Sequence, residues 1–168
     1  SPTENQESNL KFDLSSGATT EFWVKFGDLD RATTTQTQVL FDLSNSQLSG
    51  SDASSPYGRF YIYYYNNGVA SASGFKASLQ SGSVATSTML YSISDGLTLA
   101  STGSWNHYAI TVANDGSDLA YQVYENGTIV NTITETGQAI NEITGALIAT
   151  VGALNSAAYT TPGVTTGS

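Results

Sequence analysis

The chain has 168 residues and contains no cysteine, a single histidine and only five basic residues. The absence of cysteine excludes disulfide scaffolds, thiolate zinc clusters and thiol nucleophiles. The single histidine, His107, excludes metal sites built on paired histidines. No apolar run approaches the roughly 18 residues that a membrane span requires. We therefore expect neither a cysteine-based site nor insertion into a membrane.

Charge is also scarce and has mainly one sign. Charged residues make up 11% of the chain, and the net charge is −9. A protein that neutralises phosphates needs clustered lysine and arginine. The five cations here are scattered along the chain: Lys11, Lys25, Arg31, Arg59 and Lys76. This pattern argues against nucleic acid and anionic membrane surfaces as partners. The acidity serves either solubility or the binding of divalent cations.

What the chain does have is many short runs of alternating apolar and polar residues, separated by Gly, Asn, Asp and Ser. Such runs predict half-buried strands, and almost no segment has helical periodicity. An apolar share of 39% is enough for a core. We therefore predict an all-β fold, an antiparallel two-sheet β-sandwich. Its strands are expected at 10–14, 21–26, 39–43, 59–65, 105–112 and 145–153, with weaker ones near 75–79 and 89–93. A further strand begins at 121 and closes into a hairpin within the segment 121–130.

Two turn signals are clear in this pattern. Asn66-Asn67-Gly68 ends the tyrosine-rich strand and predicts a hairpin. Asn126-Gly127 predicts a type I′ hairpin turn, for which positive φ angles are required. It is also the start of a glycosylation sequon, but the turn alone accounts for these residues.

The order of several motifs resembles a known family. Glu21-Phe-Trp-Val24 precedes the core strand Val39-Leu-Phe-Asp42. Trp105 and His107 then open a strand that precedes a Tyr-x-Asn126-Gly127 turn, and an apolar strand follows at 145–152. This layout resembles the laminin-G-like branch of the concanavalin A-like lectin/glucanase superfamily. The resemblance implies a concanavalin A-like jelly roll whose strands form a passive binding surface. We expect residues 1–168 to be a single laminin-G-like domain.

The resemblance breaks down at the C-terminal end. The family has a closing strand of the type Gly-x-Ile-Asp-Glu-Phe, whereas this chain stops at Ser168. An unpaired sheet position of that kind is a liability as an exposed edge. We therefore expect the domain to be part of a longer chain that lacks its usual closing strand here, or to be completed by a neighbouring chain through strand addition.

The superfamily includes glucanases, so catalysis has to be weighed. Retaining glycoside hydrolysis needs two carboxylates about 5 Å apart. The family's Glu-x-Asp-x-x-Glu strand is absent, and the one closely spaced acidic pair, Asp28 and Asp30, lies in a predicted loop. His107 is expected to pack beside Trp105. We therefore expect no catalytic residues and no enzymatic activity.

The resemblance also raises the question of calcium. Laminin-G-like domains often hold one Ca²⁺ at the rim through Asp side chains and backbone carbonyls. The candidates here are Asp42, Asp115 and Asp118, of which the Asp115–Asp118 segment is the most compact; Asp52 is a further loop candidate. The alternative is that each Asp in a turn accepts hydrogen bonds from its own backbone. No cofactor is certain, and Ca²⁺ is the one that the sequence leaves open.

The tyrosine-rich strand gives the strongest binding signal. Alternation places Phe60, Ile62 and Tyr64 on one face and Arg59, Tyr61, Tyr63 and Tyr65 on the other. The second set would carry three phenols and a guanidinium on the outside, where they can contact sugar rings or a protein partner. The alternative is cross-strand aromatic pairing that stabilises an exposed sheet.

These observations favour a non-catalytic binding or adhesion module that recognises glycan or a protein surface. It would belong to an extracellular, cell-surface or virion surface protein. The alternative is a purely structural virion component, such as a capsid decoration, tail or fibre domain of a phage, in contact with neighbouring subunits. A glucanase-like glycoside hydrolase is the weakest of the three hypotheses.

Overall fold

The computed structural model describes residues 12–25, 35–45, 57–97, 104–145 and 147–152. Strands dominate these ranges, and each of the two short 3-10 helices has three residues. None of the described helices is long and apolar enough to cross a membrane. The elements are β1 (Phe12–Asp13), β2 (Ala18–Val24), β3 (Gln36–Asn45), β4 (Gly58–Asn66), η1 (Ala70–Ala72), β5 (Gly74–Ser81), β6 (Val84–Ser92), η2 (Ile93–Asp95), β7 (Asn106–Asn114), β8 (Leu119–Glu125), β9 (Thr128–Glu135), β10 (Glu142–Ile143) and β11 (Leu147–Val151).

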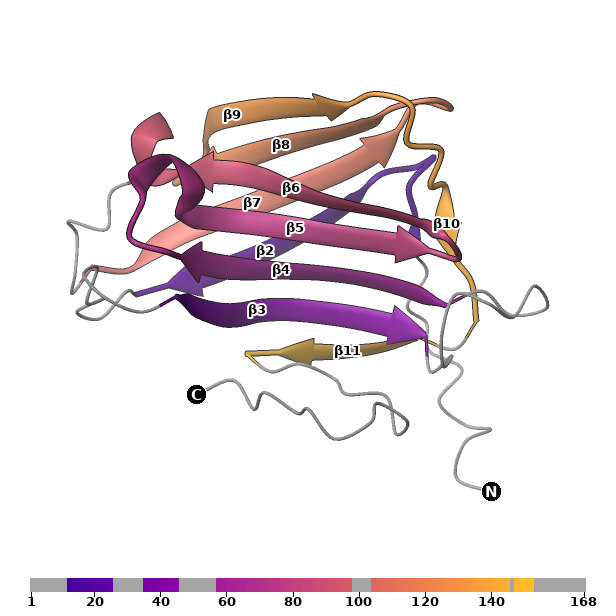
Figure 1. Ribbon diagram of the computed structural model, residues 1–168, viewed down its shortest axis with the longest axis horizontal. Coiled ribbons are helices and arrows are strands. Elements are labelled where there is room, and N and C mark those ends of the chain that lie inside the picture. The colour runs from indigo at the N-terminus through magenta and orange to yellow at the C-terminus, as the bar shows by residue number, and fades with distance from the viewer. Residues whose placement is uncertain (1–11, 26–34, 46–56, 98–103, 146, 153–168) are drawn as a thin grey trace, which may run out of the picture.

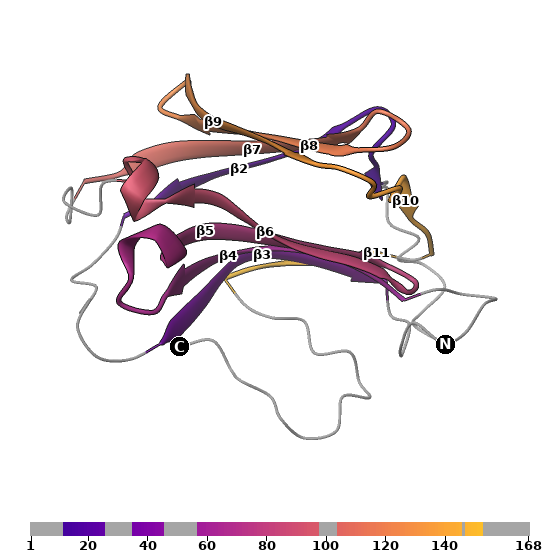
Figure 2. The same cartoon turned by 45° about the horizontal axis from the view of Figure 1, so that its top comes forward.

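The strands form two antiparallel sheets that pack face to face (Figures 1 and 2). One sheet has the order β11-β3-β4-β5-β6, and the other has the order β2-β7-β8-β9. The short strands β1 and β10 pair with each other at one end of the sandwich. The prediction of an all-β, antiparallel two-sheet sandwich is confirmed.

The core lies between the two sheets and follows the alternation of the strands. Phe60, Ile62 and Tyr64 of β4 point inward, as do Tyr108 and Ile110 of β7, and all are at most 1% exposed. Inward-facing aromatic rings also meet across the sandwich: Phe75 of β5 packs edge-on against Tyr108, with ring centroids 4.8 Å apart. Burial of these large side chains is the main force that holds the two layers together.

Polar side chains join the sheets along the side where β6 faces β8 and β9. The carboxylate of Glu125 accepts hydrogen bonds from the hydroxyls of Tyr108 (2.8 Å) and Tyr91 (3.3 Å). The amide of Asn131 donates to the carbonyl of Leu90 (2.8 Å). Hydrogen-bonded polar groups of this kind fix how the two layers are oriented, whereas an unpaired one would cost stability.

Several strand boundaries differ from the sequence-based expectation. The strands expected to be weak near 75–79 and 89–93 are the full-length β5 and β6. They are rich in Ser, Thr and Ala, and their pairing in the middle and at the edge of a sheet compensates for low strand propensity. The strand expected at 10–14 is described as β1, with two residues; residues 10 and 11 lie outside the described ranges.

The two predicted turns have different outcomes. Asn126 and Gly127 have φ angles of 50° and 83°, as the predicted type I′ turn requires. Asn66-Asn67-Gly68, by contrast, begins a longer connection that includes η1 before β5 starts. The Asn66 side chain caps this connection, since its Oδ1 accepts from the Gly68 N–H (3.1 Å) and the Ser73 hydroxyl (3.0 Å). β4 and β5 are antiparallel neighbours, but not through a two-residue turn.

A tyrosine-lined groove as candidate binding site

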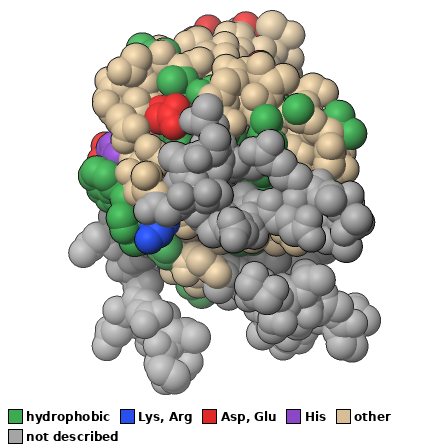
Figure 3. All heavy atoms as spheres, turned by 90° about the vertical axis from the view of Figure 1, so that its left-hand side faces the viewer, with side chains coloured by type: hydrophobic (Ala, Val, Ile, Leu, Met, Phe, Trp, Pro, Cys, Tyr) green, Lys and Arg blue, Asp and Glu red, His purple; other side chains and the backbone are tan. Residues whose placement is uncertain are grey.

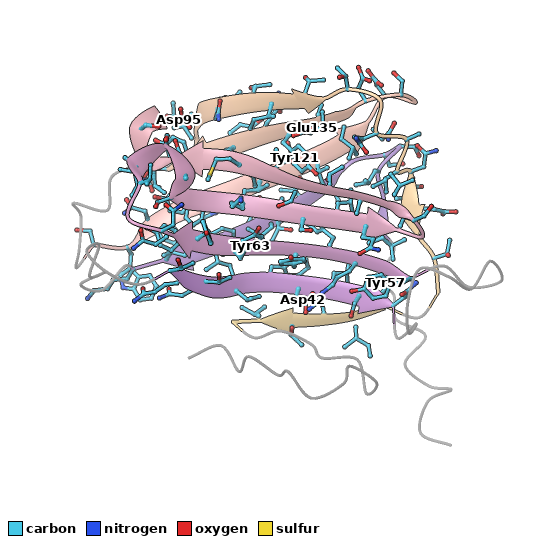
Figure 4. All side chains as sticks on the ribbon, in the orientation of Figure 1. Asp42, Tyr57, Tyr63, Asp95, Tyr121 and Glu135 are labelled. Atoms are coloured by element: carbon cyan, nitrogen blue, oxygen red, sulfur yellow. The ribbon has the colours of Figure 1, made fainter. Side chains whose placement is uncertain are left out.

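The outer face of the five-stranded sheet carries the residues that the sequence singled out. Arg59, Tyr61, Tyr63 and Tyr65 alternate with the core residues of β4 and point away from the other sheet. Thr37 and Val39 of β3 pair with Tyr65 and Tyr63, and Lys76 of β5 pairs with Tyr63 from the other side. These seven residues line an open groove of about 440 Å³. We call it the tyrosine groove; Figure 4 labels Tyr63 near the middle of β4.

The aromatic rings in the groove pack against one another. Tyr61 and Tyr63 stack, with centroids 5.1 Å apart and planes inclined by 25°. The guanidinium carbon of Arg59 lies 5.1 Å from the centroid of Tyr61, and the ammonium of Lys76 lies 5.0 Å from that of Tyr65. Both separations are within the range of cation–π attraction. The ring faces of these tyrosines already contact neighbouring rings or cations. The groove therefore presents ring edges, phenol hydroxyls and cations to a ligand.

Tyr63 is the most enclosed of the three outer tyrosines. Its side chain is only 8% exposed, and its hydroxyl lies 3.4 Å from that of Ser87 on β6. Tyr61 and Tyr65 are only partly buried. Tyr63 therefore stabilises the row of rings, while Tyr61 and Tyr65 are more accessible. The Tyr63 ring stacks on Tyr61 of the same strand, whereas its partners on the neighbouring strands are Val39 and Lys76, so this stacking is not the cross-strand aromatic pairing that the alternative proposed.

A β-bulge in β3 brings Asp42 to the groove side of the sheet. Val39 pairs with Tyr63, but Phe41 pairs with Ile62, so Leu40 is an extra residue. Regular alternation from Val39 would have put Asp42 on the core face. The bulge reverses this, and Asp42 instead pairs with Tyr61 on the outer face.

Asp42 forms a two-pronged ion pair with Arg59. Arg59 Nε donates to Asp42 Oδ1 at 2.8 Å, and Nη2 donates to Oδ2 at 2.7 Å. The Asp42 side chain is fully buried, whereas that of Arg59 is 21% exposed. The hydrogen bonds to Asp42 raise the pKa of Arg59 above its ordinary value, so the guanidinium stays charged. The pair holds Arg59 in place at one end of the groove.

The three Asp residues proposed for calcium do not lie together. Asp42 is in the five-stranded sheet, whereas Asp115 and Asp118 are in the β7–β8 turn of the other sheet. Asp115 Oδ1 accepts from the backbone N–H groups of Asp118 (2.9 Å) and Ser117 (3.1 Å), which lower the Asp115 pKa. Asp118 Oδ1 accepts from the N–H of Gly137 (2.9 Å).

The Asp115 contacts match the alternative in which a turn carboxylate accepts hydrogen bonds from its own backbone. Asp118 accepts instead from the backbone of Gly137, outside the turn. In the described part of the chain, no three His, Cys, Asp or Glu side chains gather in a way that would hold a metal ion. Asp52, the further loop candidate, lies outside the described residues. Calcium at Asp115 and Asp118 is thus an untested alternative: the oxygen ligands have the right chemistry but already accept hydrogen bonds.

Glycoside hydrolysis would need two neighbouring carboxylates, but Glu21, Glu125 and Glu135 are dispersed over the fold. Glu125 lies between the sheets with Tyr108 and Tyr91, as described above. Glu135 accepts a hydrogen bond from Thr88 (2.9 Å); Figure 4 labels it beside Tyr121. Glu21 lies on the outer face of β2. Asp28 and Asp30 lie outside the described ranges.

Sequence reasoning missed a second aromatic surface, on the outer face of the four-stranded sheet. His107 of β7 pairs with Trp23 of β2, with ring centroids 5.1 Å apart, and its Nε2 lies 3.5 Å from Glu21 Oε2. The aromatic neighbour that the structure gives His107 is thus Trp23, where Trp105 was expected. Trp23 and Trp105 are both 63% exposed. Figure 3 shows hydrophobic side chains gathered beside the histidine. The signal was present in the alternation of β2, which puts Trp23 and Phe22 on opposite faces of the strand.

The two-sheet fold agrees with the comparison to known families. A family model described as the concanavalin A-like lectin/glucanases superfamily, of the laminin G type, matches residues 4–165. The match covers nearly the whole chain. A comparison with curated proteins finds no match.

Proposed function

Because the chain belongs to the concanavalin A-like lectin/glucanase superfamily, we propose that it is a non-catalytic module that binds glycan through the tyrosine groove. The observation that carries this proposal is the convergence of Tyr61, Tyr65 and Lys76 on one open groove of about 440 Å³. This volume falls within the range of roughly 300–1,000 Å³ that is common for ligand sites. The module would act outside the cell, on a cell surface or on a virion.

The chemistry of the groove suits sugar hydroxyls. A phenol both donates and accepts hydrogen bonds, and the partly buried Tyr61 and Tyr65 present this group at the edges of their rings. The antiparallel pairing of β4 with β3 on one side and β5 on the other holds these side chains in place. A rigid platform loses little conformational entropy on binding, which favours affinity.

The composition of the groove supports binding without cleavage. Among the described residues that line it, none is an Asp or a Glu. Glycoside hydrolysis requires a pair of carboxylates on either side of the scissile bond. Asp42, the nearby carboxylate on the same face of the sheet, is already bound to Arg59 by two hydrogen bonds.

A glycan array with and without Ca²⁺, followed by calorimetry on the best ligand, tests this proposal. Tyr61→Phe and Tyr65→Phe keep the rings but remove the hydroxyls, and each should weaken binding about fivefold, the value of one hydrogen bond. Trp23→Ala changes the outer face of the other sheet and should leave the affinity unchanged. Binding that is lost in Trp23→Ala and kept in both tyrosine variants would refute the groove as the site.

A structural role in an assembly is the second candidate, and β11 favours it. This strand pairs with β3 on one side, and no other described strand pairs with its opposite side. Val151 is 81% exposed and Ile148 is 42% exposed. An apolar edge strand can accept a strand from a neighbouring subunit. Such a module would serve as a capsid decoration, tail or fibre domain.

The two candidates give different results in solution. Glycan binding by the monomer supports the first proposal. A domain that binds no glycan on the array and that self-associates supports the second, and Val151→Lys should then abolish the association. Release of reducing ends from laminarin by the purified protein would contradict both.

A further inference from the structure

The charge of the tyrosine groove is unusual for this chain. The chain has a net charge of −9 and five basic residues. Three of these lie in the described ranges, namely Lys25, Arg59 and Lys76, and two of the three line the groove. The described part of the groove lining contains no acid. The chain is acidic overall, yet two of its basic side chains lie on the outer face of the five-stranded sheet.

The two cations of the groove are in different electrostatic situations. The Arg59 charge is balanced by the buried Asp42 carboxylate, at 2.7 and 2.8 Å. Arg59 therefore needs no anion from a ligand. Its role is to close one end of the row of rings, since it also lies over Tyr61.

Lys76 has no such carboxylate partner among the described residues. Its ammonium lies over the ring of Tyr65, at 5.0 Å from the centroid. A ring quadrupole attracts a cation but carries no net negative charge, so it does not balance the ammonium. The neighbours of Lys76 across the sheet are Tyr63 on β4 and Met89 on β6, and neither has a carboxylate side chain. The side chain is partly buried, so its charge is less well solvated than a free lysine's.

We infer that the groove selects an acidic sugar, a hexuronate residue whose carboxylate pairs with Lys76 while its hydroxyls bond to Tyr61 and Tyr65. This inference rests on the proposed function. Charge complementarity supports it, because a carboxylate supplies the anion that the described surroundings of Lys76 lack. The hydroxyls of the same sugar residue meet the phenol-lined part of the groove. A neutral sugar would satisfy the phenols and leave the ammonium unpaired.

A matched pair of ligands tests this inference. The probes are hexagalacturonate and its fully methyl-esterified form, which share a backbone and differ in the charge of the carboxyl groups. Calorimetry with the full chain should show about tenfold tighter binding of the acid, and the difference should shrink as salt screens the ion pair. Lys76→Gln should remove the preference, and Lys76→Arg should retain most of it.

Lys25→Gln is the control, because Lys25 follows β2 of the other sheet and is exposed. It should keep the full preference for the acid. Circular dichroism and melting curves establish that each variant is folded. Equal binding of the acid and the ester, or a preference that survives in Lys76→Gln, overturns the inference. If a neutral glycan binds in a tyrosine-dependent manner and hexagalacturonate does not, the proposed function stands and the inference falls. If no sugar binds, both fall.

Discussion

Asp42 of β3 and Arg59 of β4 meet on the outer face of the sheet through two hydrogen bonds, 2.8 and 2.7 Å long, with the carboxylate fully buried. The pairing depends on the bulge at Leu40, without which Asp42 would point into the core. A buried carboxylate is tolerated only when it is paired. One irregular residue in β3 thus determines which cation at the groove is balanced by an acid.

The first prediction concerns this pair. Asp42→Ala should lower the free energy of unfolding by roughly 3 kcal/mol, the low end for a broken buried pair, because Arg59 is 21% exposed and partly solvated. Urea denaturation measures this loss. The double variant Asp42→Leu/Arg59→Met should recover much of the stability, because both charges are then removed. A double variant less stable than Asp42→Ala would contradict this account.

The second prediction concerns Gly74, at the start of β5. It has a φ of +156°, and a Cβ there would collide with the carbonyl oxygen of Tyr91 and lie 2.7 Å from the Cα of Ser92. Both are backbone atoms of β6, which the sheet ladder holds in place. Gly74→Ala should therefore lower the free energy of unfolding by more than about 2 kcal/mol.

Gly127→Ala is the comparison for Gly74→Ala. Gly127 also has a positive φ, +83°, but no atom of the described residues lies within 4 Å of a Cβ built there. That variant should lose about 1 kcal/mol from backbone strain alone. Equal losses in the two variants, measured by urea denaturation, would show that the close approach of β5 to β6 is not the cause.

The third prediction is a loss of stability in alkali. Burial raises the pKa of Tyr121 from 10.0 to about 12. Burial also raises the pKa of Tyr108, and the hydrogen bond to Glu125 adds to this rise. Below pH 10 both the folded and the unfolded chain keep these protons. Between pH 10 and 12 the unfolded chain releases them while the folded chain holds them, so the free energy of unfolding falls as the pH rises.

Each such tyrosine contributes about 1.4 kcal/mol per pH unit in that window. Tyr121→Phe should therefore flatten the decline between pH 10 and 12, as measured by urea denaturation at a series of pH values. Tyr124→Phe removes a phenol from the outer face of the same strand and is the control for the loss of a hydroxyl as such. A Tyr121→Phe slope equal to that of the wild type would show that this phenol is not the source.

The fourth prediction concerns calcium. The carboxylates of Asp115 and Asp118 already accept backbone hydrogen bonds at 2.9 Å. We expect EDTA to leave the melting temperature unchanged, because a bound ion would have to replace those bonds. A fall in the midpoint that Ca²⁺ restores would contradict this expectation, since only a ligand of the folded state stabilises in that way. In that case, the melting temperature of the Asp115→Asn variant should no longer change with EDTA or Ca²⁺.

Much of the fold was accessible from the sequence because alternation is a local property. Phe60, Ile62 and Tyr64 on one face, and the tyrosines on the other, follow from period-two spacing alone. The Asn126-Gly127 turn was equally clear, because its positive φ angles demand those residue types. β5 and β6 were underestimated, since their Ser, Thr and Ala residues have weak strand preference and depend on pairing with β4.

The groove was accessible in part, for the same reason. Spacing placed Arg59, Tyr61, Tyr63 and Tyr65 on one face. It did not give the partners that come from other strands. Asp42 reaches Arg59 through a bulge, and Lys76 reaches Tyr65 through the register of β5. Bulges and registers depend on tertiary pairing, which no local pattern encodes. Asp42 was consequently assigned to a calcium site that also held Asp115, a residue of the other sheet.

The central claim is that sugar binds in the tyrosine groove, and an NMR titration of the labelled chain with the best ligand of the glycan array tests it most directly. The account predicts shifts confined to the backbone and rings of β3, β4 and β5, with the largest at Tyr61, Tyr65 and Lys76. The indole N–H signals of Trp23 and Trp105, which lie on the opposite sheet and before β7, should not move. Shifts at the two indoles with none at the tyrosines would contradict the account.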